Sequence, residues 1–280
     1  NAFLALMLYF RPDGSQNGKF FYASVFLIDA LAVLLAGVRG SVLGVIVGLI
    51  VFGLLYSFSF NSQKFKKLTL GFLILVFALA GILYSLRNAE FVKESHYFAR
   101  YSDISLKSFT VQTRFWAWQA GFNGWNDSLR TIVLGWGPEM FNVPFSKHFN
   151  PKFFRGIGSE TLFDRAHNQF LEVLFTMGIV GFAAYLLIFV RAFGILNKIN
   201  DTAENKVFRL GLISALLAYM IHNFFIFDTS ANYVMFFIAL GFINFLGLKN
   251  HEEGVRIIKR QTMANMVGLI LTIAVIFSIY

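Results

Sequence analysis

Four side chains of this 280-residue sequence have the chemistry to bind and displace an anion: Arg39, Arg114, Arg165 and His167. A guanidinium is always charged, and its planar fork of N–H groups matches the oxygens of a phosphate. An imidazole titrates near neutral pH and can accept a proton from an attacking hydroxyl. If these residues line one outer cavity, they could bind a lipid-linked diphosphate and activate the hydroxyl that displaces it.

Each of these residues also has an ordinary structural explanation. Arg39 could anchor a membrane helix at the interface, and Arg114, which lies close to two tryptophans, could make a cation–π or lipid-headgroup contact. Arg165 could form a surface ion pair with Asp164, and His167 could make an interfacial hydrogen bond without any catalytic role. The residue types therefore define candidates, and their arrangement in space has to decide between these explanations.

Three further polar residues are secondary candidates for the same cavity: Asn168, His222 and Asp228. Asn168 follows His167 directly and could instead cap a helix. Ionisable residues within an apolar span are functional candidates by default, because their burial is costly. His222 could nevertheless be neutral and hydrogen-bonded to a neighbouring helix.

The composition places these residues in a membrane protein. The sequence is 57% hydrophobic and 14% charged, whereas soluble domains average about 45–50% and about 25%. It contains no cysteine, which excludes a disulfide scaffold, a thiolate nucleophile and a cysteine-based metal site. The histidines and carboxylates show no metal-ligand spacing such as His-x-x-x-His, so we predict neither a metal nor another cofactor.

Apolar stretches of about 20 residues, the length that spans a bilayer, recur along the chain. We predict an all-α, polytopic transmembrane bundle of about seven spans plus a partial first helix over Asn1–Phe10. That first stretch is interpreted as the tail of a helix that begins outside this chain, which would be the C-terminal portion of a longer protein. The predicted spans are Phe20–Gly37, Ser41–Phe60, Leu68–Leu86, Asn168–Phe193, Phe208–Phe227, Tyr233–Leu248 and Thr262–Tyr280.

A long polar segment divides the chain into N-terminal helices (1–86), a large loop (87–166) and C-terminal helices (167–280). The loop holds all four tryptophans and three of the four prolines, a composition that suits short helices and turns on a membrane surface. A structureless loop of this length is uncommon, so we expect it to fold and to carry function. Arg114 is expected at the start of an amphipathic helix within it.

The net charge of +9 can be explained by the orientation of the chain in the membrane. Of the 24 basic residues, 13 lie in four connections that share one side if the seven spans alternate. Positive charge is retained on the cytoplasmic side, which puts the large loop and Arg39 on the periplasmic or extracytoplasmic side. The basic excess therefore indicates membrane orientation and anionic membrane lipids rather than nucleic acid.

Three motifs surround the candidate residues: Gly37-Val38-Arg39-Gly40-Ser41; Arg114-Phe115-Trp116-Ala117-Trp118 with the later turn Leu134-Gly135-Trp136-Gly137-Pro138; and Arg165-Ala166-His167-Asn168-Gln169-Phe170-Leu171 continued by Gly178-Ile179-Val180-Gly181. In order and spacing they resemble the O-antigen ligase and O-antigen polymerase superfamily of bacterial integral membrane glycosyltransferases, over about Leu31–Gly241. The third motif, similar to the family's His-Asn-x-x-Leu and Gly-x-x-Gly element, is the most specific. Val38 departs from the serine usual in the family's Ser-Arg-Gly element.

The resemblance implies transfer of a glycan from an undecaprenyl-diphosphate carrier to an acceptor hydroxyl of a glycan, lipid or protein. The reaction would occur at the outer face of the bacterial cytoplasmic membrane, without metal or nucleotide, in lipopolysaccharide or polysaccharide biosynthesis. The resemblance further implies that Arg39 and Arg114 bind the diphosphate and that His167 is the base. Arg165 is added because it stands beside the His-Asn pair.

Two other functions remain open from the sequence. A polymerase of the same superfamily would use a second lipid-linked repeat unit as acceptor, and nothing in the sequence separates it from a ligase. A solute transporter would also have many spans and buried charges, but it should show paired repeats or helices interrupted at mid-depth. The polar candidates here gather at one membrane face instead.

Overall fold

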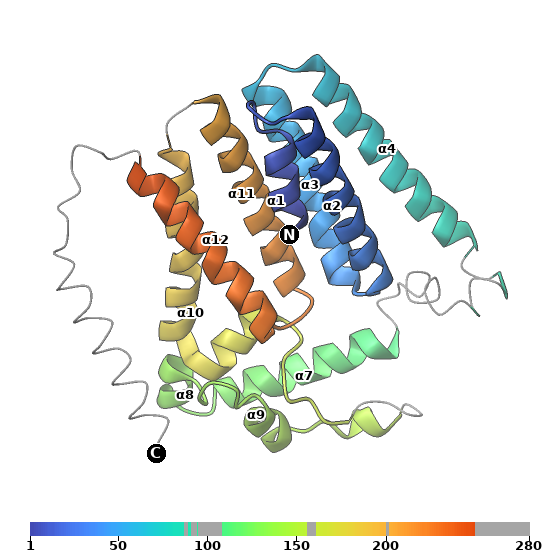
Figure 1. Cartoon of the computed structure of the whole chain (residues 1–280). Coiled ribbons are helices and arrows are strands. Elements are labelled where there is room, and N and C mark those ends of the chain that lie inside the picture. The colour runs from blue at the N-terminus through green and yellow to red at the C-terminus, as the bar shows by residue number, and fades with distance from the viewer. Residues whose placement is uncertain (87–88, 91–93, 95–107, 156–160, 200–201, 250–280) are drawn as a thin grey trace.

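The described part of the chain is built from helices (Figure 1). A computed structural model describes residues 1–86, 89–90, 94, 108–155, 161–199 and 202–249, and no strand occurs among them. The six long helices of the bundle are α2 (Gln16–Leu35), α3 (Arg39–Ser59), α4 (Gln63–Leu86), α10 (Gln169–Asn197), α11 (Ala203–Asn223) and α12 (Ser230–Lys249). The other elements are α1 (Ala2–Tyr9), α7 (Phe109–Trp125), α8 (Leu129–Leu134), α9 (Asn142–Lys147) and a 3₁₀ turn, η1 (Pro151–Arg155).

Five of these helices are long and apolar enough to cross a membrane: α2, α3, α4, α10 and α12. The chain is therefore a multi-pass membrane protein, and the predicted all-α polytopic bundle is confirmed. The expected span Phe208–Phe227 corresponds to α11, which ends at Asn223 and is not among the five. The expected span Thr262–Tyr280 lies outside the described residues.

Helix α11 lies within the bundle, where it packs against α1, α3, α10 and α12. Its contact with α3 is close because Gly40, Gly44 and Gly48 follow one another at intervals of four residues on α3. A Cβ at Gly44 would lie 2.5 Å from the carbonyl oxygen of Ala218, and small residues at this spacing let two helix backbones approach. This packing sets the beginning of α3 beside the end of α11.

Helix α10 is broken at Gly178, which the sequence analysis did not predict. Gly178 has non-helical angles, φ 64° and ψ −168°, and a side chain there would collide with the carbonyl of Val133 in α8. The rings of Phe170 and Phe189 lie 6.5 Å apart, although a straight helix would separate these residues by about 28 Å at ~1.5 Å per residue. The segment 169–177 is therefore folded back along the segment 179–197, and the latter remains long enough to span a bilayer at ~28 Å.

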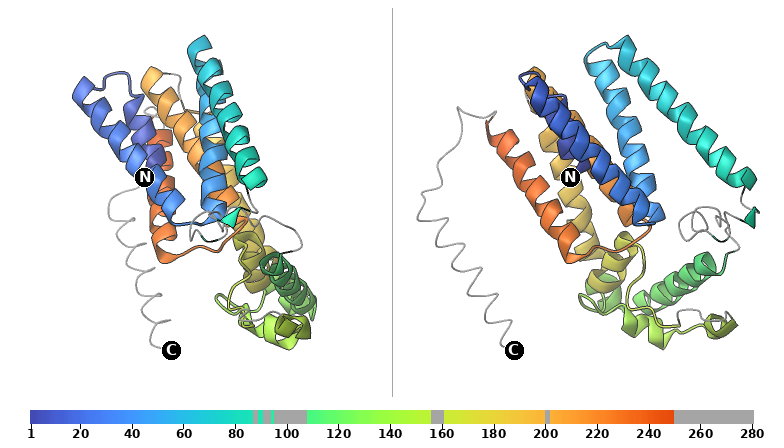
Figure 2. Two further views of the ribbon diagram at one scale, coloured as in Figure 1. Left: turned by 90° about the vertical axis from the view of Figure 1, so that its right-hand side faces the viewer. Right: turned by 45° about the vertical axis from the view of Figure 1, so that its right-hand side comes forward.

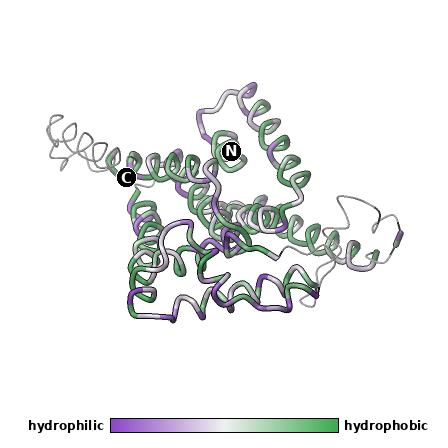
Figure 3. Tube along the Cα trace, turned by 90° about the horizontal axis from the view of Figure 1, so that it is seen from below, coloured by the Kyte–Doolittle hydropathy of each residue, from purple (hydrophilic) through white to green (hydrophobic). Residues whose placement is uncertain are grey.

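The two ends of the bundle differ, as Figures 1 and 2 show. The α1–α2 and α3–α4 connections, the end of α10, the start of α11 and the end of α12 lie at one end. This arrangement confirms, for the described residues, that the basic connections share a side. Helices α7, α8 and α9 lie at the opposite end, here named the α7–α9 end. In Figure 3 the long helices are mostly hydrophobic, and hydrophilic residues occur mainly at helix ends and in the region of α7–α9.

The helices of the α7–α9 end share a small aromatic core. It joins α7, α9, η1, the stretch before α10 and the folded-back start of α10. Its buried members are Ala117, Ala120, Phe141, Phe145, Phe153, Phe163, Ala166 and Phe175. This core fixes the stretch that contains Arg165 and His167 against α7.

Candidate active site

The candidate residues meet at the turn between α11 and α12, residues 224–229, here named the α11–α12 turn. Gln169, the first residue of α10, donates its backbone N–H to the carbonyl of Ile226 over 3.1 Å. Its side-chain Oε1 accepts the backbone N–H of Asp228 over 2.9 Å. The beginning of α10 is thereby fixed to the turn, together with Asn168 and His167, which precede it.

Arg114 and the beginning of α3 reach the same turn. Arg114 Nη1 donates a hydrogen bond of 3.1 Å to the carbonyl of Phe225. Gly40 lies against the side chain of the same residue, since a Cβ at Gly40 would be 2.7 Å from Phe225 Cβ. Arg39 and Arg114 are therefore carried by two elements that both contact Phe225.

Helix α7 also holds the stretch that precedes α10. Trp118 Nε1 donates a 2.7 Å hydrogen bond to the carbonyl of Ala166. The prediction that α7 starts at Arg114 is wrong, because the helix begins at Phe109, whose ring packs edge-on against Trp116 at 5.8 Å. Arg114 consequently lies in the second turn of α7, where it reaches the α11–α12 turn while Trp118 reaches the stretch beside His167.

Arg39 begins α3 and is exposed. Gly37, with φ 67°, makes the sharp turn that precedes the helix, and no acidic residue occurs in the first turn. The N-terminus of a helix carries a partial positive charge, so an arginine there adds to a potential that already favours anions. An anionic group at this end of α3 would meet both.

His167 has a strained backbone conformation. Its φ is 52°, a left-handed conformation that is uncommon for a residue with a side chain and is often found at functional sites. Its ring lies edge-on between Phe163 and Phe227, with centroid distances of 5.2 and 5.3 Å. Nδ1 lies 3.2 Å from the carbonyl oxygen of Arg165. Because a carbonyl only accepts, Nδ1 is the donor in this bond, and in a neutral ring the lone pair would then lie on Nε2.

Arg165 is already paired. It forms an ion pair with Glu139, its Nη1 lies 4.0 Å from Glu172 Oε1, and its guanidinium lies 5.5 Å from the ring centroid of Phe227. Its carboxylate partners among the described residues are thus Glu139 and Glu172, whereas the sequence analysis considered Asp164. These partners offset part of the charge that Arg165 would offer to a diphosphate.

Glu172, which was not among the residues predicted from the sequence, lies beside the candidate residues. Its carboxyl is buried, with 4% of the residue exposed, and Oε2 accepts a 2.6 Å hydrogen bond from the backbone N–H of Ala166. Asn168 acts beside it as the N-cap of α10, accepting the N–H of Leu171 over 3.1 Å. The available signal was an acidic residue inside an apolar stretch, which is costly to bury and so requires a partner.

His222 and Asp228 connect the helices around the turn. His222 Nδ1 lies 2.9 Å from Ser41 Oγ at the start of α3, and its Nε2 lies 3.4 Å from Asn232 Nδ2 at the start of α12. Asp228 accepts hydrogen bonds from Tyr219 Oη and Asn223 Nδ2, at 2.7 and 3.1 Å. Burial raises the pKa of the Asp228 carboxyl, and these two hydrogen bonds act in the opposite direction. Both residues bind neighbouring helices of the protein.

Two hollows in the described part of the chain lie away from these residues. One of about 380 Å³ lies at the basic end, beside Arg11, Lys19 and Tyr56. The other, of about 180 Å³, lies between α7 and the stretch that joins α9 to η1. Neither is lined by Arg39, Arg114 or His167. The predicted site residues are therefore carried by elements that share one turn, and neither of these two hollows is the expected outer cavity.

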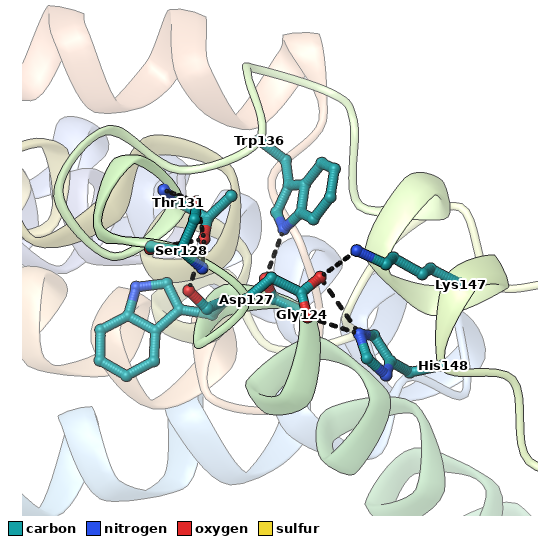
Figure 4. Close-up of polar contacts among 8 residues, drawn as sticks. Gly124, Asp127, Ser128, Thr131, Trp136, Lys147 and His148 are labelled. Carbon is teal, nitrogen blue, oxygen red and sulfur yellow. Dashed lines mark hydrogen bonds and ion pairs between the residues drawn. The ribbon is translucent and has the colours of Figure 1, made fainter.

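A second polar cluster ties the helices of the α7–α9 end together (Figure 4). Asp127, which follows α7, contacts Lys147 Nζ at 2.9 Å and His148 Nε2 at 3.0 Å. Hydrogen bonds from Lys147 and then His148 lower the pKa of Asp127. Trp136 donates its indole N–H to the carbonyl of Gly124 over 2.9 Å. The end of α7, the turn after α8 and the end of α9 are held in one arrangement by these bonds.

The chain was compared with known protein families. A family model described as O-Antigen ligase matches residues 24–186. The matched range contains Arg39, Arg114, Arg165 and His167, and it extends past the break at Gly178. No curated protein matches the chain.

Proposed function

The chain belongs to the O-antigen ligase family, and we propose that it transfers a glycan from an undecaprenyl-diphosphate carrier to an acceptor hydroxyl at the outer face of the bacterial cytoplasmic membrane. Family membership supports glycosyl transfer of the ligase or polymerase type. The donor, the direction across the membrane and the roles of individual residues are the content of the proposal.

In the proposed reaction, the acceptor oxygen attacks the anomeric carbon of the first sugar. The bond between that carbon and the diphosphate oxygen breaks, and undecaprenyl diphosphate leaves with the electron pair. The acceptor proton passes to His167 Nε2. A diphosphate is a good leaving group once its charge is neutralised, so positioned cations and one base are sufficient for this displacement.

The observation that carries this proposal is the backbone conformation of His167 together with the contacts of its ring. Its backbone is left-handed, its ring lies between two aromatic rings, Nδ1 is bonded to the Arg165 carbonyl, and Nε2 makes no hydrogen bond to the described residues. A base needs such a nitrogen within reach of the proton that it takes. His222, by contrast, has partners at both ring nitrogens.

Arg39 and Arg114 are the proposed ligands of the diphosphate. They come from α3 and α7, two elements that meet at Phe225. An anion bound by Arg39 would also meet the positive end of α3. Arg165, which is paired with Glu139 and lies close to Glu172, is the third proposed ligand.

The proposed orientation follows from the distribution of charge. The basic connections lie at one end of the bundle, and the candidate residues lie towards the α7–α9 end. Under the positive-inside rule the basic end is cytoplasmic, so the α7–α9 end would face the periplasm. Cysteine substitutions are a direct test, since the natural chain has no cysteine. Asn142→Cys should react with a membrane-impermeant maleimide in intact spheroplasts, and Lys64→Cys should react only after lysis.

The decisive experiment measures transfer by the purified full-length protein in lipid nanodiscs. The donor is the cell's own undecaprenyl-diphosphate-linked glycan, offered with either a lipid acceptor or a second lipid-linked glycan. We expect His167→Ala to lower the rate about 10²–10⁴-fold, the usual contribution of general acid–base catalysis, and Arg39→Ala to lower it comparably. Arg130→Ala, an exposed arginine of α8, is the matched control and should retain transfer.

Retained transfer by folded His167→Ala and Arg39→Ala proteins would overturn the proposed mechanism. The choice of acceptor separates the two activities within the family. Product on the lipid acceptor identifies a ligase, and elongation of the second lipid-linked glycan identifies a polymerase.

A further inference from the structure

We infer that the hollow beside α7 is a subsite for a sugar of the glycan, separate from the residues around the α11–α12 turn. The hollow has a volume of about 180 Å³, the space of about six waters at ~30 Å³ each. This is the scale of one sugar ring and falls below the ~300–1,000 Å³ of sites for drug-sized ligands. Its lining includes Trp116, Gln119, Asn123, Phe149 and Asn150.

The chemistry of the lining suits an uncharged, hydroxyl-rich ligand. Trp116 and Phe149 are partly buried aromatic residues, and their faces can pack against the apolar C–H face of a pyranose. Gln119 and Asn123 are exposed, and they make no side-chain hydrogen bond to the described residues. Each amide offers two donors and one acceptor group, which can bind vicinal hydroxyls.

The rest of the lining is held in place by bonds within the protein. Asn150 Oδ1 accepts the backbone N–H of Lys152 over 3.0 Å, which leaves the amide NH₂ available to donate. His148 also lines the hollow, and Asp127 holds its Nε2 at 3.0 Å, as Figure 4 shows. The amides are neutral and the His148 nitrogen is already engaged by a carboxylate, so a neutral sugar fits this lining better than a phosphate.

The position of the hollow indicates which part of the substrate it would take. Residues 116, 119, 120 and 123 follow one another at helical spacing and share one face of α7. Arg114 and Trp118 lie on the opposite face, where they bind Phe225 and Ala166. The hollow is thus about one helix diameter, ~10 Å, from the residues proposed to act on the diphosphate. It would bind a sugar some units away from the reacting bond.

This inference rests on the proposed function, because it assumes a glycan substrate. It is tested by binding, which requires no transfer. The probe is the oligosaccharide released by mild acid from the lipid-linked glycan of the producing cells. Its Kd is measured by isothermal titration calorimetry with the full chain in lipid nanodiscs. We expect the double variant Gln119→Ala/Asn123→Ala to raise the Kd about tenfold or more, and Asn142→Ala, an exposed amide of α9 outside the hollow, to leave it unchanged.

Steady-state transfer provides a second readout that a loss of folding would not reproduce. In the double variant the KM for the full-length glycan donor should rise about tenfold, whereas kcat and the KM for a donor that carries a single sugar should stay constant. Equal Kd values for the double variant, the control and the natural chain would overturn the subsite. Saturable oligosaccharide binding that depends on Gln119 and Asn123 in a protein without transfer activity would support the subsite and refute the proposed function.

Discussion

Glu172 holds the backbone beside His167, and its removal should lower activity more than stability. Oε2 of Glu172 accepts the N–H of Ala166 over 2.6 Å, and Ala166 is fully buried. In Glu172→Ala that N–H loses its acceptor. An unsatisfied buried donor costs about 1–3 kcal/mol.

The free energy lost with this hydrogen bond can be compared with the strain in the left-handed backbone of His167. A residue with a side chain in that conformation stores about 1–3 kcal/mol, which the surrounding bonds must offset. The bond lost in Glu172→Ala is of the same size, so the stretch 165–167 should relax to ordinary backbone angles in much of the population. Since ~1.4 kcal/mol is a factor of ten, we expect kcat to fall about 10–100-fold.

The assay is glycan transfer in nanodiscs, with thermal unfolding measured on the same samples. Glu172→Gln keeps an oxygen that can accept the Ala166 N–H, and it should recover most of the activity that Glu172→Ala loses. The matched control is Glu139→Gln, which removes the more exposed carboxylate partner of Arg165. Exposed ion pairs contribute only about 0–1 kcal/mol, so this variant should transfer at nearly the natural rate.

Natural transfer rates in a folded Glu172→Ala protein would show that the strained backbone does not need this carboxyl. An equal loss of transfer rate in Glu172→Ala and Glu172→Gln would show that the charge of Glu172 is required rather than its acceptor oxygen. This result would also refute the reasoning.

Two further predictions concern the supporting structure. Gly178→Ala should lower both the unfolding temperature and the transfer rate, because φ is 64° there and a Cβ would collide with the Val133 carbonyl. The control Gly194→Ala should be tolerated, because no atom lies within 4 Å of the added Cβ. Equal unfolding temperatures for the two variants would contradict the bend. For pH, the lowered pKa of Asp127 means that its pairing stabilises the α7–α9 end above the unfolded pKa near 3.8. This stabilisation is lost as the pH falls through the still lower folded pKa. Tryptophan fluorescence should report an acid transition below pH ~4, and Asp127→Asn should remove Asp127's share of it; an unchanged transition would rule out this pairing as its cause.

The sequence was sufficient to predict the long helices because each depends on local composition. A run of about 20 apolar residues has few alternatives to a membrane span, and α2, α3, α4 and α12 appear within a few residues of their predicted bounds. Alternation of the predicted spans across the membrane also predicted that the basic connections share one side. The span Asn168–Phe193 was likewise predicted and corresponds to α10, but the bend within this run of apolar residues was not predicted.

That bend depends on contacts between segments far apart in the chain. The carbonyls of Phe175 and Thr176 lose helical partners near Gly178, and the backbone N–H groups of Trp136 and Gly137 bind them at 3.1 and 2.8 Å. The two motifs containing Gly135–Gly137 and Gly178 are thus two halves of one contact. Periodicity within either stretch carries no information about this pairing, so the sequence analysis treated the motifs separately.

Candidate residues were predictable by type, and their partners were not. An arginine or histidine in so apolar a chain stands out, which identified Arg114 and His167. Glu172 was missed because a single carboxylate in an apolar helix has no spacing pattern. Only the fold shows that its acceptor oxygen meets the backbone beside His167.

The bend in α10 explains how a helix of a membrane protein can carry a polar site at its N-terminus. If residues 169–197 formed one straight helix, the segment 169–177 would extend about 14 Å further from the bundle at ~1.5 Å per residue, and Gln169 could not bind the α11–α12 turn. Folding back returns this segment to the bundle, where Phe170 packs on Tyr185 and Phe224. Its N-cap then lies at the turn that Arg114 and Gly40 also contact. The same apolar helix therefore spans the membrane with one part and positions His167 with the other, so the location of His167 depends on the glycine eleven residues after it.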